Sequence, residues 1–158
     1  MNENITGAIG HIEKSTHALL VTVGEENKPF AREIGPFVNS GLDIYFVTRI
    51  DSQKVKQFTV KPYITLYFPN MNPDPEEFKS VTVTGTCVRI PAGAEFNGVL
   101  DKLDRKSPGY VKYISKEGFE IWTIFKMTAK TLQYTDYSKS TRTVKIEVRK
   151  AGDSYRET

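Results

Sequence analysis

The residues best suited to chemistry in this sequence surround the point where a predicted strand, 42–48, leads into a predicted helix, 52–60. The first N–H groups of such a helix have no partner within it and, together with the helix dipole, they attract an anion such as phosphate. Ser52 adds a hydroxyl donor there, and Lys54 adds a positive charge. We expect the hairpin order to bring Arg32 beside the strand 42–48, where its guanidinium would complete a phosphate clamp.

The same residues also have a purely structural explanation. Asp51 is a good N-cap, and Asp51 with Ser52 would start a helix whose Lys54 and Lys56 point to solvent. Sequences that cap helices are common. The residues alone therefore leave a phosphate clamp and a plain helix cap about equally open.

Other catalytic signatures are scarce. The only histidines are His11 and His17, and neither has a cluster of Cys, His or carboxylate ligands nearby, so we expect no metal site. The sequence contains no G-x-S-x-G elbow, no P-loop and no G-x-G-x-x-G motif. The single cysteine, Cys87, alternates with Val81 and Val83, and we expect it to be a small buried hydrophobic residue.

Period-two alternation of β-branched and aromatic residues dominates the chain and predicts a mainly β protein. The predicted strands are 18–23, 29–38, 42–48, 63–68, 78–90, 120–134 and 143–149. Helical spacing of apolar residues predicts short helices over 52–60, over 93–103 and around His11 near the N-terminus. Strands in hairpin order with short helices between them suggest a small closed barrel of six or seven antiparallel strands.

Length and charge limit the function classes. The 158 residues suit one domain over 1–158, and no apolar run is long enough to span a membrane. The N-terminus lacks the features of a secretory signal and the lone cysteine fits a reducing compartment, so we expect a cytoplasmic protein. Residues 1–100 carry net charge −2 and residues 101–158 carry +5, with basic and acidic residues interleaved. This pattern favours a solvated basic face over a nucleic-acid site.

Five segments share their order and spacing with a known family. They are 32–36, 45–48, 51–55, 61–68 and 78–86, within a match over roughly residues 15–135. Together they resemble the pyridoxamine 5′-phosphate oxidase superfamily, above all its short bacterial branch of general stress protein-like flavin-binding proteins. The resemblance implies an FMN-binding split β-barrel that forms a homodimer, with the flavin held in clefts between the subunits.

The resemblance also implies which residues contact FMN. Arg32 matches the arginine that reaches the phosphate, and Ser52 and Lys54 match the serine and lysine at the start of the helix. Gln53 stands where the oxidases often have an arginine, which weakens the clamp without removing it.

Two further regions correspond to the rest of the flavin. Phe46, Val47 and Thr48 match the strand that lines the isoalloxazine ring and the ribityl chain. Ser80 falls near the position from which the oxidases direct a glutamine toward the ring.

Two departures separate this sequence from the oxidases that act on vitamin B6. Phe37 stands where they have a lysine, and their C-terminal arginine-x-histidine motif is absent from residues 133–158. We therefore expect no useful oxidation of pyridoxamine 5′-phosphate.

Three functions stay open on these residues. The first is a flavin-dependent oxidoreductase that accepts a hydride from NADH or NADPH, whose phosphates the basic residues after 101 would attract. The second is a non-enzymatic flavin carrier or stress-related binding protein. The third keeps the barrel but binds haem or a deazaflavin, with His11 and His17 as the available imidazoles.

Overall fold

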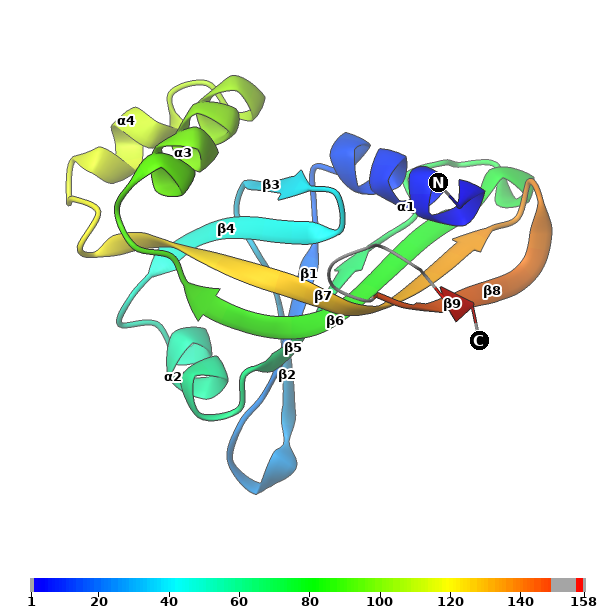
Figure 1. The fold of residues 1–158 in the computed structure, drawn as a ribbon, viewed down its shortest axis with the longest axis horizontal. Coiled ribbons are helices and arrows are strands. Elements are labelled where there is room, and N and C mark those ends of the chain that lie inside the picture. The colour runs from blue at the N-terminus through cyan, green and yellow to red at the C-terminus, as the bar shows by residue number, and fades with distance from the viewer. Residues whose placement is uncertain (1, 149–155, 158) are drawn as a thin grey trace.

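The computed structural model describes residues 2–148 and the backbone of 156–157, and all of its strands belong to one coiled antiparallel sheet (Figure 1). The strands are β1 (Leu19–Val23), β2 (Pro29–Glu33), β3 (Phe37–Ser40), β4 (Asp43–Arg49), β5 (Tyr63–Phe68), β6 (Lys79–Arg89), β7 (Trp122–Asp136), β8 (Ser140–Glu147) and β9 (Arg156–Glu157). The predicted fold class, mainly antiparallel β with short helices in a split barrel, is confirmed. Arg149, the last residue of the predicted strand 143–149, lies outside the described residues.

The sheet is split between β2 and β3. Its order is β2-β1-β5-β6-β7-β4-β3, and β8 and β9 continue from β7. The predicted single strand 29–38 is wrong, because it breaks at Ile34, Gly35 and Pro36 into β2, which pairs with β1, and β3, which pairs with β4. Pro36 has no N–H to give to a ladder, which explains the break. This break and the short β9 raise the count to nine strands among the described residues.

Side chains from both faces of the sheet are buried. One apolar cluster fills the barrel and includes Phe37, Phe46, Phe58 and Phe125. A second cluster lies between the outer face of β4 and β7 and the helices α3 (Ala94–Lys106) and α4 (Tyr110–Ser115). Figure 1 shows these two helices together at one end of the sheet. Helix α4 was not predicted from the sequence, because its 6 residues are too few to show helical periodicity.

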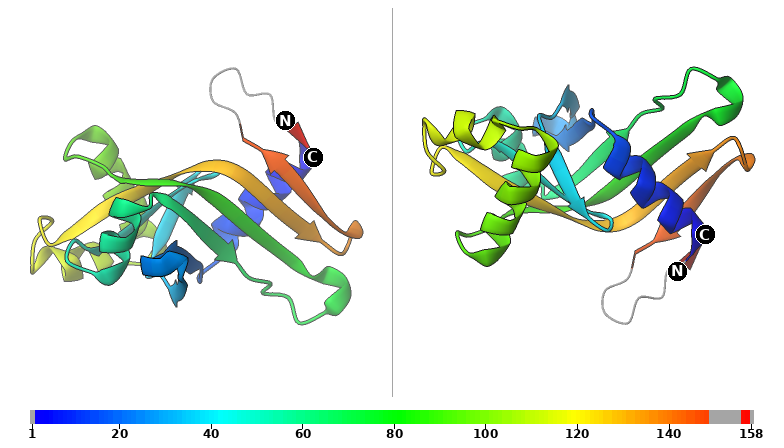
Figure 2. Two further views of the ribbon diagram at one scale, coloured as in Figure 1. Left: turned by 90° about the horizontal axis from the view of Figure 1, so that it is seen from below. Right: turned by 90° about the horizontal axis from the view of Figure 1, so that it is seen from above.

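Besides two short 3₁₀ helices, Glu25–Asn27 and Pro75–Glu77, two α-helices remain among the described residues, and they lie apart along the long axis of the molecule (Figure 2). In both further views, α1 (Glu3–Lys14) lies toward β8 and β9, whereas α2 (Gln53–Val60) lies toward α3 and α4 (Figure 2). Asn2 caps α1, because its side chain accepts a hydrogen bond from the Asn4 N–H over 2.8 Å. Pro62 follows α2 and explains where this helix ends.

Strand β6 has no room for a side chain at Gly85. A Cβ atom at this position would lie 2.0 Å from the carbonyl oxygen of Thr128, and the β6–β7 register shifts between Thr84 and Gly85. Only glycine fits there. Two residues on, Cys87 is 4% exposed and burial raises the pKa of its thiol to about 12, which confirms the prediction of a buried, unreactive cysteine.

Candidate functional site

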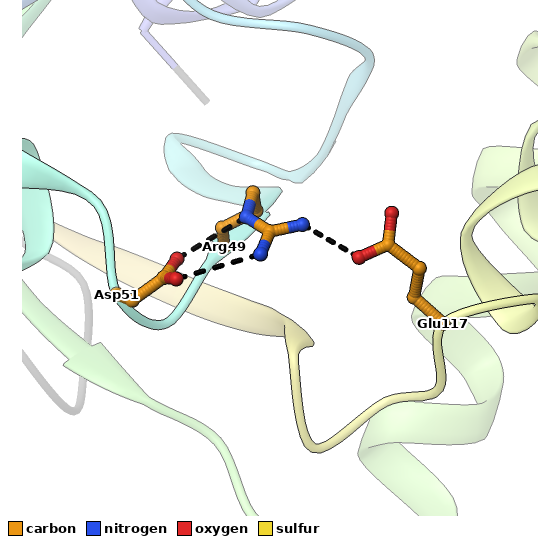
Figure 3. A network of polar contacts seen from close by, with 3 residues as sticks. All are labelled: Arg49, Asp51 and Glu117. Atoms are coloured by element: carbon orange, nitrogen blue, oxygen red, sulfur yellow. Dashed lines mark hydrogen bonds and ion pairs between the residues drawn. The ribbon is translucent and has the colours of Figure 1, made fainter.

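The loop that leads from β4 into α2 is held by Arg49 (Figure 3). Its Nε donates to Asp51 Oδ1 over 3.2 Å, and its Nη1 donates to Glu117 Oε2 over 2.6 Å. The hydrogen bond from Arg49 keeps the pKa of the Asp51 carboxyl below its ordinary value. Asp51 is therefore occupied, and the prediction that it caps the helix is wrong. The N-cap is Ser52, and α2 begins at Gln53.

Ser52 has a hydroxyl without a partner. Its Oγ is shielded from solvent and has no hydrogen-bond partner among the described residues, and it makes no capping bond to α2. Buried hydroxyls in proteins are almost always hydrogen-bonded. An unsatisfied one at the start of a helix fits a site whose ligand brings acceptor atoms.

The Arg32 side chain reaches α2 across the end of the barrel. Its Nη1 donates to Thr22 Oγ1 over 2.7 Å and to the Phe30 carbonyl over 3.0 Å, and its Nη2 donates to Gln57 Oε1 over 2.8 Å. The Thr22 hydroxyl donates to the same Gln57 oxygen over 2.5 Å. Arg32 is thus fixed by a hydroxyl, an amide and a main-chain carbonyl, all of them uncharged.

The expectation that β2 would place Arg32 beside β4 is wrong, because β2 pairs with β1. The side chain nevertheless reaches the predicted helix, through Gln57 in the second turn of α2. Neither Gln57 nor Thr22 was predicted as a site residue. A signal for Gln57 was present, since it follows Lys54 by three positions and so lies on the same face of the helix.

Lys54 and Arg32 form a pair of positive charges with no acid between them. Burial and the nearby Arg32 charge both lower the pKa of Lys54. Neither residue takes part in any ion pair formed within residues 2–148. The structure therefore brings Arg32, Ser52 and Lys54 to the N-terminal part of α2, where the helix dipole adds to their positive potential. Gln53, the first residue of α2, is exposed at the same place.

The predicted flavin-lining residues of β4 are all buried. The Phe46 ring is 0% exposed and packs against Phe58 and Phe125, so its side chain faces the core. Val47 packs under α3, and Thr48 is also buried. Main-chain groups of β4 are free to bind a ligand, because in the described part of the chain β3 pairs with β4 only as far as Phe46. From Val47 to Arg49 the main-chain groups of β4 on that side have no strand partner in the described sheet.

Ser80 lies apart from the other predicted residues. It is near the start of β6 and pairs with Thr135. Through Leu20 and Leu66, the sheet register places Arg32 level with Val83 of β6, three strands away from β6 and three positions along from Ser80. Three strand spacings alone are roughly 14 Å. Within one chain, Ser80 and the group around Arg32 therefore do not meet.

Two pockets in the described part of the chain also lie elsewhere. One of about 570 Å³ lies beside α1 and is lined by His11, Lys79 and Asp136, among others. The other, of about 670 Å³, lies between α3 and the sheet and is lined by Arg89 and Phe96, among others. Neither pocket is lined by Arg32, Ser52 or Lys54, so the volume of a pocket does not identify the candidate site. The feature that marks a candidate site is the pair of positive charges at α2.

The histidines differ in their surroundings. His11 Nε2 lies 3.2 Å from the Phe68 carbonyl oxygen and 3.0 Å from that of Pro69. Carbonyl oxygens only accept hydrogen bonds, so Nε2 carries a hydrogen atom and is the donor in both contacts. His17 is exposed. Within residues 2–148 no group of three or more His, Cys, Asp or Glu side chains is placed to hold a metal ion.

No helix in the described ranges combines the length and the apolar character that crossing a bilayer demands.

The fold is shared with solved structures. It is similar to a haem-binding protein from Mycobacterium smegmatis, with a TM-score of 0.76 and 15% identity over 93% of this chain and 59% of that chain. It is also similar to a protein from Clostridium acetobutylicum related to general stress protein 26, of the pyridoxinephosphate oxidase family, with a TM-score of 0.66 and 17% identity over 92% of this chain and 94% of that chain. A third is HutZ, the haem storage protein from Vibrio cholerae, with a TM-score of 0.63 and 12% identity over 76% and 85% of the two chains.

Comparison at the level of sequence gives the family. No curated protein matches the chain. A sequence-family model described as pyridoxamine 5′-phosphate oxidase matches residues 9–136, which is most of the chain. The chain therefore belongs to the pyridoxamine 5′-phosphate oxidase family.

Proposed function

We propose that this protein binds FMN and holds its phosphate at the start of α2 with Arg32, Ser52 and Lys54. The observation that supports this most strongly is the pair of cations without a carboxylate. A phosphate dianion would compensate both charges and accept hydrogen bonds from both side chains. The Ser52 hydroxyl, buried and unpaired, would gain the acceptor that it lacks.

The unpaired edge of β4 is where we propose that the ribityl chain and the ring of the flavin lie. Main-chain N–H and C=O groups between Val47 and Arg49 can bond a ribityl chain or a ring edge, even though the Phe46 side chain faces the core. We place the flavin beside this edge, with Gln53 at its rim. Ser80 contributes only if a second chain brings it there.

The proposal therefore includes a homodimer with the flavin at the cleft between subunits. Val60, Tyr63 and Val88 are 78%, 58% and 55% exposed. Tyr63 follows Val60 by three residues and pairs with Thr86, two residues before Val88. Large exposed apolar side chains near one another commonly mark an interface. A two-fold pair is the commonest way to cover one.

As for activity, we propose an oxidoreductase in which bound FMN supplies the hydride-accepting chemistry and NADH or NADPH is the donor. The chain would position the flavin and needs no acid or base of its own, which agrees with the few catalytic side chains near α2. Phe37 is 0% exposed and apolar, so it cannot supply the charge that the lysine at this position supplies in the oxidases that act on vitamin B6. The alternative is a flavin carrier or stress-related binding protein without turnover.

A haem-binding function is the second candidate, because two similar structures are a haem-binding and a haem storage protein. Against it, His11 is only 7% exposed and its Nε2–H is hydrogen-bonded to main-chain carbonyls. The exposed His17 would then be the imidazole left for iron. A deazaflavin phosphate would use the same cations as FMN.

Titration of the purified protein with FMN and with riboflavin, followed by quenching of flavin fluorescence, tests the proposal. We expect FMN to bind at least tenfold more tightly, because riboflavin lacks the phosphate. Any chromophore that copurifies is released and identified by mass. Equal affinities would refute the phosphate site, and a Soret band with bound haem would favour the second candidate.

A further inference from the structure

Arg32 is anchored entirely by uncharged groups. Its Nη1 lies 2.7 Å from Thr22 Oγ1, and its Nη2 lies 2.8 Å from Gln57 Oε1. These two oxygens are hydrogen-bonded to each other over 2.5 Å. Both Nη atoms of the guanidinium are thus held by side-chain oxygens that bring no negative charge. Buried or half-buried arginines are more often paired with a carboxylate.

This arrangement leaves one edge of the guanidinium free. Nη1 donates to Thr22 Oγ1 and to the Phe30 carbonyl, and Nη2 donates to Gln57 Oε1. The Nε–H group and the second N–H of Nη2 have no acceptor in the described part of the chain. These two groups lie side by side on one edge of the planar fork, which is the geometry that binds two oxygens of a phosphate.

We propose that Gln57 is a positioning residue that makes the site selective for a phosphomonoester, by fixing the free edge of Arg32 without neutralising it. The inference rests on the proposed function and adds a residue to it. Gln57 suits this role because it is 8% exposed in the middle of α2, one helical turn beyond Lys54. Its side chain therefore moves little, and it joins the helix that carries Ser52 and Lys54 to the hairpin that carries Arg32.

The neutral amide is the decisive chemical feature. A glutamate at the same place would hold Arg32 with the same oxygen and would bind it more strongly. It would also cancel one of the two positive charges that the phosphate requires. Gln57→Glu should therefore preserve the fold and lose the ligand, which is the opposite of what a residue with only a structural role would do.

The test compares FMN with riboflavin in three variants. In Gln57→Glu we expect FMN affinity to fall by about 10- to 100-fold, with riboflavin affinity unchanged. In Gln57→Met, which keeps the volume and removes the acceptor, we expect a fall of about 2- to 10-fold, again for FMN alone. Lys56→Gln is the control, because it makes the same change in net charge at the neighbouring, exposed position of α2. We expect Lys56→Gln to leave the ratio of FMN affinity to riboflavin affinity within about twofold of the wild-type ratio.

Thermal unfolding without flavin separates positioning from folding. We expect Gln57→Glu to keep the wild-type midpoint. Equal losses of FMN and riboflavin affinity in Gln57→Met, or an unchanged affinity ratio in Gln57→Glu, would overturn the inference. Failure of the proposed function looks different, because wild-type protein would then bind the two flavins equally or not at all.

Discussion

The hydroxyl of Tyr134 lies only 2.6 Å from the position that a Cβ atom on Gly7 would occupy. Helix α1 thus approaches β7 closely enough for the tyrosine ring to cover the glycine. The Tyr134 side chain is held in place, since it is 3% exposed and donates to Asp136 Oδ2 over 3.1 Å. At Gly10, one helical turn later, nothing lies within 4 Å of such a Cβ atom.

These two glycines predict opposite effects of the same substitution. Alanine in a helix gains about 1 kcal/mol over glycine, but overpacking a core costs about 1–3 kcal/mol. We expect Gly7→Ala to lower the free energy of unfolding by up to about 2 kcal/mol, because Tyr134 cannot move away freely. We expect Gly10→Ala to raise it by about 0.5–1 kcal/mol. Urea unfolding measures the free energy of unfolding of both variants. A Gly7→Ala variant more stable than the wild type would show that the Tyr134 ring moves aside.

A charge reversal at Lys54 tests the phosphate site directly. We expect Lys54→Glu to weaken FMN binding by about 10- to 100-fold and riboflavin binding by much less, because only FMN carries the phosphate. Lys56→Glu is the matched control, since this side chain is exposed on the same helix. Isothermal titration or fluorescence quenching gives the affinities. Equal losses in both variants would indicate general electrostatics and reject the clamp.

The buried thiol of Cys87 predicts a pH dependence of stability. Its pKa is about 12 in the folded protein against an ordinary 9.0, so the unfolded chain releases the proton first. The thiol therefore favours folding below pH 9.0, and this contribution is lost as pH rises toward 12. Between these pH values, we expect the stability of Cys87→Ala to fall less steeply than that of the wild type. Parallel curves from denaturant titrations would contradict the burial of this group.

The proposed homodimer predicts a single assembly state. We expect light scattering at micromolar concentration to give twice the chain mass of 17.9 kDa. Tyr63→Glu places a charge among the exposed apolar side chains of α2, β5 and β6, and it should shift the protein toward monomer. Tyr113→Glu, at a 60% exposed position on α4, is the control. A wild-type monomer would refute the dimer.

The proposed activity predicts which donors reduce the bound flavin. Under anaerobic stopped flow we expect NADH or NADPH to bleach the FMN-loaded protein slowly, and pyridoxamine 5′-phosphate to leave it oxidised. Bleaching by pyridoxamine 5′-phosphate alone would mean that the departures at Phe37 and the C-terminus carry no functional weight. No bleaching by any of these donors would favour the carrier.

The fold was predictable because its strands alternate so regularly. Strands such as β5 and β6 appear in the sequence with nearly their observed bounds, since one face of each is buried in the barrel. Pro36 marks the break between β2 and β3 in the sequence, but the strand-like residues on both sides of it do not show that the pairing partner changes there. Pairing partners depend on the whole sheet, and local patterns do not contain them.

The charged residues of the site were predicted from the sequence, but the neutral residues that hold Arg32 in place were not. Ser52 and Lys54 follow from the strand-to-helix order alone. Thr22 required the structure, and the only sequence signal for Gln57 was its place on the same helix face as Lys54, because the partner of a neutral buried side chain is not visible in the sequence. Asp51 was misread for a related reason, since Arg49 competes for its carboxylate.

The open edge of the split barrel has a further consequence, for solubility. In the described sheet, β2 pairs only with β1, so its outer edge presents main-chain groups that a strand of another molecule can join. Pro29, which lacks an N–H, and the exposed, charged Glu33 protect this edge against aggregation. Glu33 therefore matters for solubility although it is not part of the proposed flavin site. A Glu33 variant that precipitates has lost this protection, and its precipitation says nothing about flavin binding.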